Sequence, residues 1–283
     1  MVYIFCVQKH IISYMAPGEM FFIEHLNELR MRFLRIIIFA ISIVIFSSIF
    51  GIQLITVNNH SFYFFYPAVY NNIASQITFF LGNNLLPEGV KLIQTAPGQS
   101  LFAQITVSIL LGITGTIPII VKEIFGFISP AISKKTQTKT FFKFIIPITV
   151  LFLTGIIFSF FIAIPVILTF LYQYGQSLGI LSFLNINEFV SFVLQFFIAF
   201  GISFQLPLIM YIISLTGLVG IGFWLKNFRY ALIAIVIFGA LITPDGSGLT
   251  MWFISFPMLL LYFLGILLIK INVSKDNENI QNK

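Results

Sequence analysis

The feature that most constrains this chain is a series of long apolar runs that are almost free of charged residues. Lipid cannot hydrogen-bond a free backbone, whereas a helix satisfies its own N–H and C=O groups, so an apolar run of about 18 or more residues predicts a transmembrane helix. Of the 283 residues 59% are hydrophobic and only 8% are charged, which excludes a soluble globular domain. We predict an all-α integral membrane protein with six spans, at residues 33–55, 102–121, 144–171, 189–215, 230–242 and 250–269.

The basic residues between the runs indicate how the spans are oriented. With six spans, fourteen of the fifteen Lys and Arg residues fall on one side of the membrane and only Lys91 falls on the other. Because connections rich in Lys and Arg stay in the cytoplasm, both termini are predicted to be cytoplasmic. The formal net charge of +6 is then explained by orientation, and nucleic acid is not expected as a partner.

The composition divides the chain into three parts. Residues 1–22 form an N-terminal cytoplasmic extension, residues 23–270 form the six-span membrane domain, and residues 271–283 form a polar cytoplasmic tail that we expect to be disordered. The extension lacks the form of a signal peptide. The true start is open among Met1, Met15 and Met20.

Prolines within the spans predict that several helices are bent. A proline removes a helix hydrogen bond and tends to kink the helix, so kinked spans that enclose a concave face are expected. The fifth span has only 13 residues from Tyr230 to Ile242, so the bilayer thins there or the helix extends back past Lys226 and Arg229. The prolines within spans are Pro118, Pro147, Pro165, Pro207 and Pro257.

The connection at residues 56–100 is long, aromatic and weakly charged. Within it, the segment from Pro67 to Leu81 has two interpretations. It is either a helix that lies at the membrane interface or a stretch whose aromatic side chains anchor the loop in the aromatic belt.

The stretch IEHLNELRMRFLR, residues 23–35, brings two carboxylates and three arginines to the edge of the first span. Its apolar residues recur at spacings of three and four residues, as on one face of a helix, and Glu28 and Arg32 are i,i+4 neighbours. Arginines at this position orient the span. The carboxylates are not explained by orientation, because acidic groups contribute little to it and are costly to desolvate near lipid.

Four motifs resemble those of the TatC family, the multispanning receptor of the twin-arginine protein translocase. HLNELRMRFLR, from His25 to Arg35, is similar to the family's first motif, and EIFGFISPAI at 123–132 is similar to its aromatic segment that ends in Pro. SFVLQFFIAFGISFQLPLIM at 191–210 and LITPDGSGLT at 241–250 follow in the family's order. The matches cover the chain from about residue 24 to residue 270.

The resemblance implies a protein that binds signal peptides with a consecutive Arg-Arg pair at the cytoplasmic face. It also implies assembly with single-span TatA-type and TatB-type subunits, a homo-oligomer within the receptor complex, and export of folded proteins with the proton-motive force. The family's signal-binding Glu corresponds to Glu28, and the Arg that follows it corresponds to Arg30. The alternative for Glu28 is a purely local ion pair with Arg32.

The chain departs from the family at a second acidic position. Where relatives commonly have a Glu after the Pro of the second cytoplasmic connection, this chain has Thr136. We expect Glu123 to supply part of the acidic patch, with Glu24 as the other candidate. The alternative is that Glu123 only pairs with Lys122 or Arg35.

Two further positions are candidates for contact with partner helices. Gln205 lies where many relatives have an intramembrane Glu, and its amide is less costly to bury than a carboxylate. Asp245, in the turn TPDGSG, either caps the last span or takes part in subunit assembly. Gln104 and Gln195 are polar as well, and we expect neighbouring helices to provide the hydrogen-bond partners of their side chains.

An enzymatic function finds no support in the sequence. The chain has one cysteine, Cys6, and three histidines without a metal-binding spacing, and it has no P-loop, so we predict no catalytic residue, metal or cofactor. The competing class is a secondary transporter or small-solute channel, which predicts inverted repeats and charged residues near the midplane that this chain lacks. The expected location is a prokaryotic plasma membrane, with a thylakoid or organellar inner membrane as the alternative.

Overall fold

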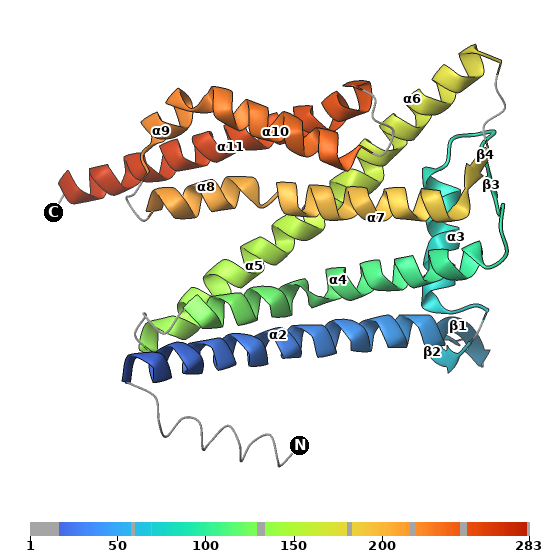
Figure 1. Ribbon diagram of the computed structural model, residues 1–283, viewed down its shortest axis with the longest axis horizontal. Coiled ribbons are helices and arrows are strands. Elements are labelled where there is room, and N and C mark those ends of the chain that lie inside the picture. Colours follow the sequence, from blue (N-terminus) through green and yellow to red (C-terminus); the bar gives the residue numbers. More distant parts are fainter. Residues whose placement is uncertain are drawn as a thin grey trace.

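The computed structural model describes residues 17–57, 60–68, 70–128, 134–179, 183–215, 219–243 and 248–281, and they are mostly helical (Figure 1). Five helical segments are long and apolar enough to cross a membrane. A sixth apolar helix is shorter, at Phe228–Ile242. The long segments are Leu26–Ile49, Gln99–Ile124, Ile145–Ser177, Ile186–Leu215 and Gly248–Ile271.

The helices follow the predicted spans in chain order. The bounds are α2 (Pro17–Ile49), α3 (Ile73–Leu85), α4 (Gln99–Ile128), α5 (Lys134–Phe158), the π-helix η2 (Ser159–Ala163), α6 (Ile164–Ser177), α7 (Ile186–Ser203), α8 (Leu206–Leu215), α9 (Ile221–Lys226), α10 (Phe228–Ile242) and α11 (Gly248–Gln281). The strands are β1 (Phe50–Val57), β2 (His60–Pro67), β3 (Lys91–Ile93) and β4 (Phe183–Asn185).

The prediction of a first span through residue 55 was wrong. Helix α2 ends at Ile49, and the chain turns at once into an antiparallel hairpin of β1 and β2. Gly51 lets the start of β1 lie close to the backbone of Asn71, because a Cβ there would collide with the backbone oxygen of Asn71. The segment FGIQLITV is rich in β-branched and aromatic residues, which fit a strand as well as a buried helix.

Of the two interpretations of the segment from Pro67 to Leu81, a helix is present, but it begins at Ile73 after β2 ends at Pro67. Helix α3 starts at Ile73, where the Asn72 side chain accepts a hydrogen bond from the backbone N–H of Ser75 at 2.8 Å. In Figure 1 α3 runs across the ends of the long helices, at the same end as all four strands. The start of α2, the end of α4, the start of α5 and the end of α11 lie at the opposite end.

Two of the five prolines within spans accompany a change in the helix. Pro165 follows η2, in which the backbone N–H of Ile164 reaches back to the carbonyl of Ser159. Pro207 follows the break between α7 and α8 at residues 204–205. Pro118, Pro147 and Pro257 lie inside α4, α5 and α11, which continue past them.

The short fifth span is not extended by a continuous helix. Helix α9 ends at Lys226, and α10 begins after Asn227, whose backbone φ of −95° and ψ of 14° interrupt the two helices. The break leaves α10 at 15 residues, about 22 Å long at 1.5 Å per residue, shorter than a hydrocarbon core of about 30 Å.

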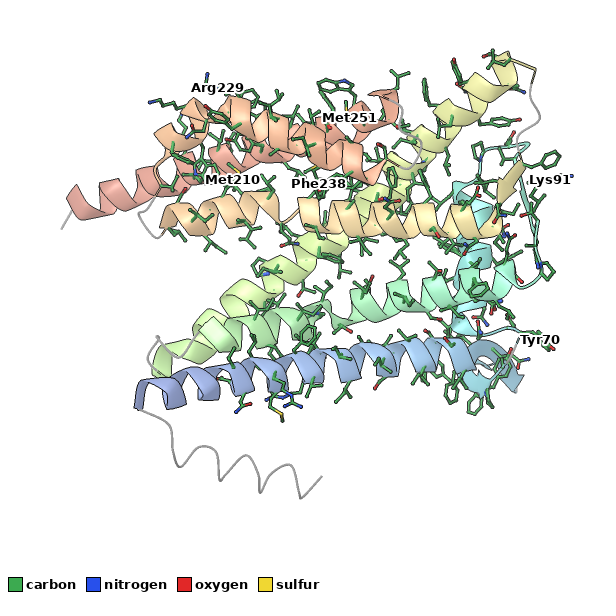
Figure 2. All side chains as sticks on the ribbon, viewed as in Figure 1. Tyr70, Lys91, Met210, Arg229, Phe238 and Met251 are labelled. Carbon is green, nitrogen blue, oxygen red and sulfur yellow. The ribbon has the colours of Figure 1, made fainter. Side chains whose placement is uncertain are left out.

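The apolar core is centred on α7, which packs against α4 and α5. Phe189, Phe196 and Phe200 of α7 are fully buried. Helix α5 approaches α7 closely at Gly155, where a Cβ would lie 2.5 Å from the backbone oxygen of Phe200. Helix α2 lies along α4, so the start of α2 lies beside the end of α4 (Figure 1). The side chains on the helices are drawn in Figure 2.

Candidate functional site

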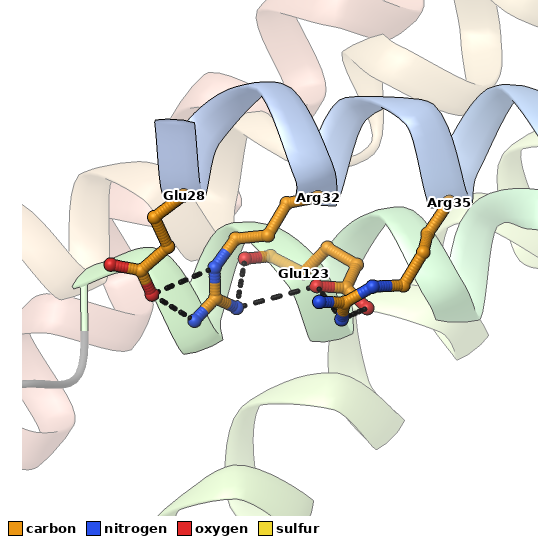
Figure 3. Close-up of polar contacts among 4 residues, drawn as sticks. All are labelled: Glu28, Arg32, Arg35 and Glu123. Carbon is orange, nitrogen blue, oxygen red and sulfur yellow. Dashed lines mark hydrogen bonds and ion pairs between the residues drawn. The ribbon is translucent and has the colours of Figure 1, made fainter. Parts of the chain in front are cut away.

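A cluster of four charged side chains joins α2 to α4 at the end of the molecule where α2 begins (Figure 3). Glu28, Arg32 and Arg35 come from α2, and Glu123 comes from α4. Their spacing on α2 is four and then three residues, which places all three on one helical face. That face lies against α4, and it brings the two arginines to Glu123.

Glu123 is a nearly buried carboxylate that holds two guanidinium groups. Its residue exposure is only 5%. Arg35 Nη1 donates to Oε1 at 2.9 Å and to Oε2 at 3.1 Å, and Arg32 Nη1 donates to Oε2 at 3.3 Å. A buried carboxylate is costly unless it is paired and hydrogen-bonded, and the two guanidinium groups provide that pairing for Glu123.

Arg32 bridges the two carboxylates. Its Nη2 donates to Glu28 Oε1 at 2.6 Å, its Nε donates to the same oxygen at 3.1 Å, and its Nη1 also donates to the backbone carbonyl of Glu123 at 3.2 Å. The Arg32 side chain is 19% exposed, whereas the Arg35 side chain is 60% exposed. Arg32 is therefore the inner guanidinium of the cluster and Arg35 is the outer one.

Both local pairings that the sequence left open occur. Glu28 pairs with Arg32, and Glu123 pairs with Arg35. The contact between Glu123 and Arg32 was not predicted. Lys122, the other partner considered for Glu123, has an exposed side chain.

Of the other candidate signal-binding residues, the structure describes the side chain of Arg30 but not that of Glu24. Arg30 is exposed, and two residues beyond Glu28 it lies on a different face of α2. The side chains of Glu24 and Thr136 lie outside the described residues, as does Asp245. The structure therefore brings together Glu28 and Glu123 among the predicted acidic residues.

Gln205 lies at the break between α7 and α8. Its Nε2 donates to the carbonyl of Ile148 on α5 at 3.1 Å and to that of Gly201 at 3.4 Å. Among the described residues, its buried Oε1 has no hydrogen-bond partner. Gln104, in contrast, accepts a hydrogen bond from Asn72 Nδ2 at 3.3 Å, as expected of a polar residue satisfied by a neighbouring segment.

Five helices able to cross a membrane, a shorter apolar helix and an ion-pair cluster at one end define a multi-pass membrane protein. Residues 24–257 match the family described as Sec-independent protein translocase protein (TatC), so the chain belongs to the TatC family. Members of this family are components of a protein translocase and are not enzymes. The match confirms the family that the four sequence motifs predicted.

Individual relatives agree over most of the chain. A TatC of Cenarchaeum symbiosum (strain A) is 46% identical over 249 residues, which is 88% of this chain and 94% of the relative. The chloroplastic TATC of Pisum sativum is 34% identical over 188 residues, 65% of this chain and 52% of that protein. Relatives thus occur in prokaryotes and in chloroplasts.

A solved structure has the same fold. The crystal structure of a protein described as Twin Arginine Translocase Receptor-TatC aligns with a TM-score of 0.70 and 28% identity, over 87% of this chain and 98% of that one. The predicted TatC-like helical architecture is therefore confirmed, although the hairpin at residues 50–67 was not predicted.

Proposed function

We propose that this protein binds signal peptides bearing a consecutive Arg-Arg pair, and that Glu28 and Glu123 receive the two guanidinium groups. The observation that carries the proposal is the pairing of one nearly buried carboxylate, Glu123, with two guanidinium groups at once. The similar crystal structure is that of a protein described as a twin-arginine translocase receptor, which supports the same substrate class.

The chain's own arginines occupy the acidic groups before a peptide binds. We propose that binding is an exchange in which one signal arginine takes the place of Arg35 on Glu123 and the other contacts Glu28. Arg35 is the more exposed of the two arginines, and its exit leaves Arg32 in place between Glu28 and Glu123. Exchange avoids an uncompensated buried carboxylate, because the outgoing and incoming groups have the same charge and donor geometry.

Discrimination against lysine follows from the geometry of the acceptors. Arg35 Nη1 contacts both oxygens of Glu123, and Arg32 presents two nitrogens to one oxygen of Glu28. A planar guanidinium forms such multiple hydrogen bonds at fixed angles, whereas a Lys ammonium is a strongly hydrated point charge. A Lys-Lys peptide is therefore expected to bind more weakly than an Arg-Arg peptide.

The remaining parts of the proposal concern topology and assembly. We propose six kinked spans in a concave, TatC-like arrangement, with both termini and the ion-pair cluster at the cytoplasmic face of a prokaryotic plasma membrane. TatA-type and TatB-type subunits would join the complex, which exports folded proteins with the proton-motive force. Support comes from the start of α2 and the end of α11 lying at one end of the molecule (Figure 1).

Contacts with other subunits are assigned to Gln205 and Asp245. The unpartnered Oε1 of Gln205 supports this assignment, because a buried acceptor without a donor is costly and a polar group of a neighbouring subunit would satisfy it. Arg30 and Glu24, on the same N-terminal segment, are proposed as further signal-binding residues.

Export in a strain that lacks its own receptor tests this function. With this protein expressed in the membrane together with matching partner subunits, a reporter with an Arg-Arg signal should be exported and the same reporter with Lys-Lys should be retained. Equal export of both reporters would refute recognition of the arginine pair. A solute channel or secondary transporter would export neither reporter.

A further inference from the structure

The hairpin of β1 and β2 extends from the end of α2 that is remote from its arginines (Figure 1). Hydrogen bonds fix the hairpin to the end of the helix bundle. The backbone N–H of Ala68 donates to the carbonyl of Ile49 at 2.8 Å, and Gln76 Nε2 donates to the carbonyl of Ile52 at 2.9 Å. The position and tilt of the hairpin are thus set by α2 and α3.

At the base of the hairpin, where its side chains are described, the two faces differ in polarity. Directly opposed residues of antiparallel strands share a face, and successive residues alternate between faces. The register pairs Phe50 with Pro67 and Ile52 with Phe65, so one face is apolar at these four positions. The opposite face includes Gln53, which is paired with Phe64, and Tyr66, whose hydroxyl accepts a hydrogen bond from Asn71 Nδ2 at 3.2 Å.

The apolar face continues the exposed surface of α2. The ring of Phe46, on α2, stacks on Phe50 at 4.9 Å between centroids and contacts Phe65 at 5.6 Å. Only 6% of the apolar window of α2 is buried, against 33% to 44% in the other four long segments. An apolar helix with so little protein cover faces lipid, and the hairpin prolongs that lipid-facing surface.

The depth of the hairpin is limited by its backbone. Within the described part of the chain the sheet has two strands, so the outer N–H and C=O groups of each strand lack a strand partner. Hydrocarbon cannot satisfy such groups, whereas water and lipid headgroups can. Aromatic side chains favour this interfacial layer, and Tyr63, Phe64 and Phe65 are each more than half exposed.

We propose that the β1–β2 hairpin is a lipid-binding element that lies flat in the headgroup layer, with the face of Ile52 and Phe65 toward the acyl chains. The absence of any Asp, Glu, Lys or Arg from Ile36 to Pro87 in the sequence supports lipid as the occupant. The element anchors the end of α2, and it is independent of the signal-binding site at the other end of that helix.

Spin labels on neighbouring residues of opposite faces test the proposal. Single cysteines are introduced by Phe65→Cys and Phe64→Cys, and by Tyr63→Cys as a more exposed position on the Phe65 face, in a Cys6→Ser background. The full chain is reconstituted in phospholipid vesicles, and the collision rates of each label with oxygen and with a water-soluble nickel chelate are measured. Labels at 63 and 65 should show a higher ratio of oxygen to nickel accessibility than the label at 64.

Equal, high nickel accessibility at all three positions would overturn the proposal, because the hairpin would then project into water. Low accessibility to both reagents at 63 and 65 would also overturn it, because a second copy or a partner protein would then cover the apolar face. Tyr63 is 73% exposed, so its substitution leaves a readable label even where the Phe65 variant folds poorly.

Discussion

Glu123→Gln should weaken the binding of an Arg-Arg signal peptide by roughly 30-fold or more, since truncating one partner of a buried charge pair costs about 2–5 kcal/mol. The amide keeps the size of the side chain but removes the charge that holds Arg32 and Arg35. Affinity is measured with a labelled peptide and the full chain in nanodiscs, for both the Arg-Arg and the Lys-Lys peptide.

Glu188→Gln is the matched control for this variant. Glu188 is exposed in the first turn of α7, at the end of the molecule opposite the ion-pair cluster, and it undergoes the same chemical change. The Glu188→Gln variant should bind the Arg-Arg peptide with the same affinity as the unsubstituted chain. Unchanged affinity in Glu123→Gln, with the protein still folded, would remove Glu123 from the binding site and leave Glu28 with Glu24 as the acidic candidates.

Arg32→Gln should lower the free energy of unfolding by about 2 kcal/mol, below the 3–5 kcal/mol of a fully orphaned buried charge because Arg35 still pairs with Glu123. The same substitution at Arg35 should cost less than about 1 kcal/mol, because the Arg35 side chain is mostly exposed. Reversible unfolding in mild detergent gives the comparison, with Arg30→Gln on the same helix as the stability control.

The two variants should also differ in peptide binding. Arg35→Gln removes the guanidinium group that a signal arginine would have to displace from Glu123, and it leaves the Arg32 bridge intact. The exchange mechanism therefore predicts that this variant binds the Arg-Arg peptide more tightly. Arg32→Gln leaves Glu28 without its i,i+4 partner and should loosen the arrangement of the two carboxylates. Equal stability losses in the two variants would contradict the inner and outer roles of the arginines.

Much of the helical fold could be predicted from the sequence, because membrane spans depend on length and hydropathy alone. The hairpin at residues 50–67 could not. Its first strand continues the apolar run of α2 without a Pro or a charge, and a continuous apolar run carries neither a clear helical nor a clear strand period. The close approach of Gly51 to the backbone of Asn71, which accompanies the hairpin, is a tertiary contact.

The candidate site was predictable in its parts but not in its assembly. The spacing of Glu28, Arg32 and Arg35 indicates one helical face, and Glu123 stands out as the one acid in its connection. The contacts between Glu123 and the arginines join residues 88 and 91 positions apart. They depend on how α2 lies along α4, which no local pattern in the sequence specifies.

The most direct measurement is photo-cross-linking from a signal peptide whose photoreactive residue adjoins the arginine pair, with the adduct located by mass spectrometry. With the full chain in nanodiscs, adducts should fall on residues 26–35 of α2 and 121–124 of α4, around Glu28 and Glu123. Unlabelled Arg-Arg peptide should displace the probe, and Lys-Lys peptide should not. Adducts at the opposite end, on α3 or the β1–β2 hairpin, or equal displacement by both peptides would contradict a twin-arginine site at this ion-pair cluster.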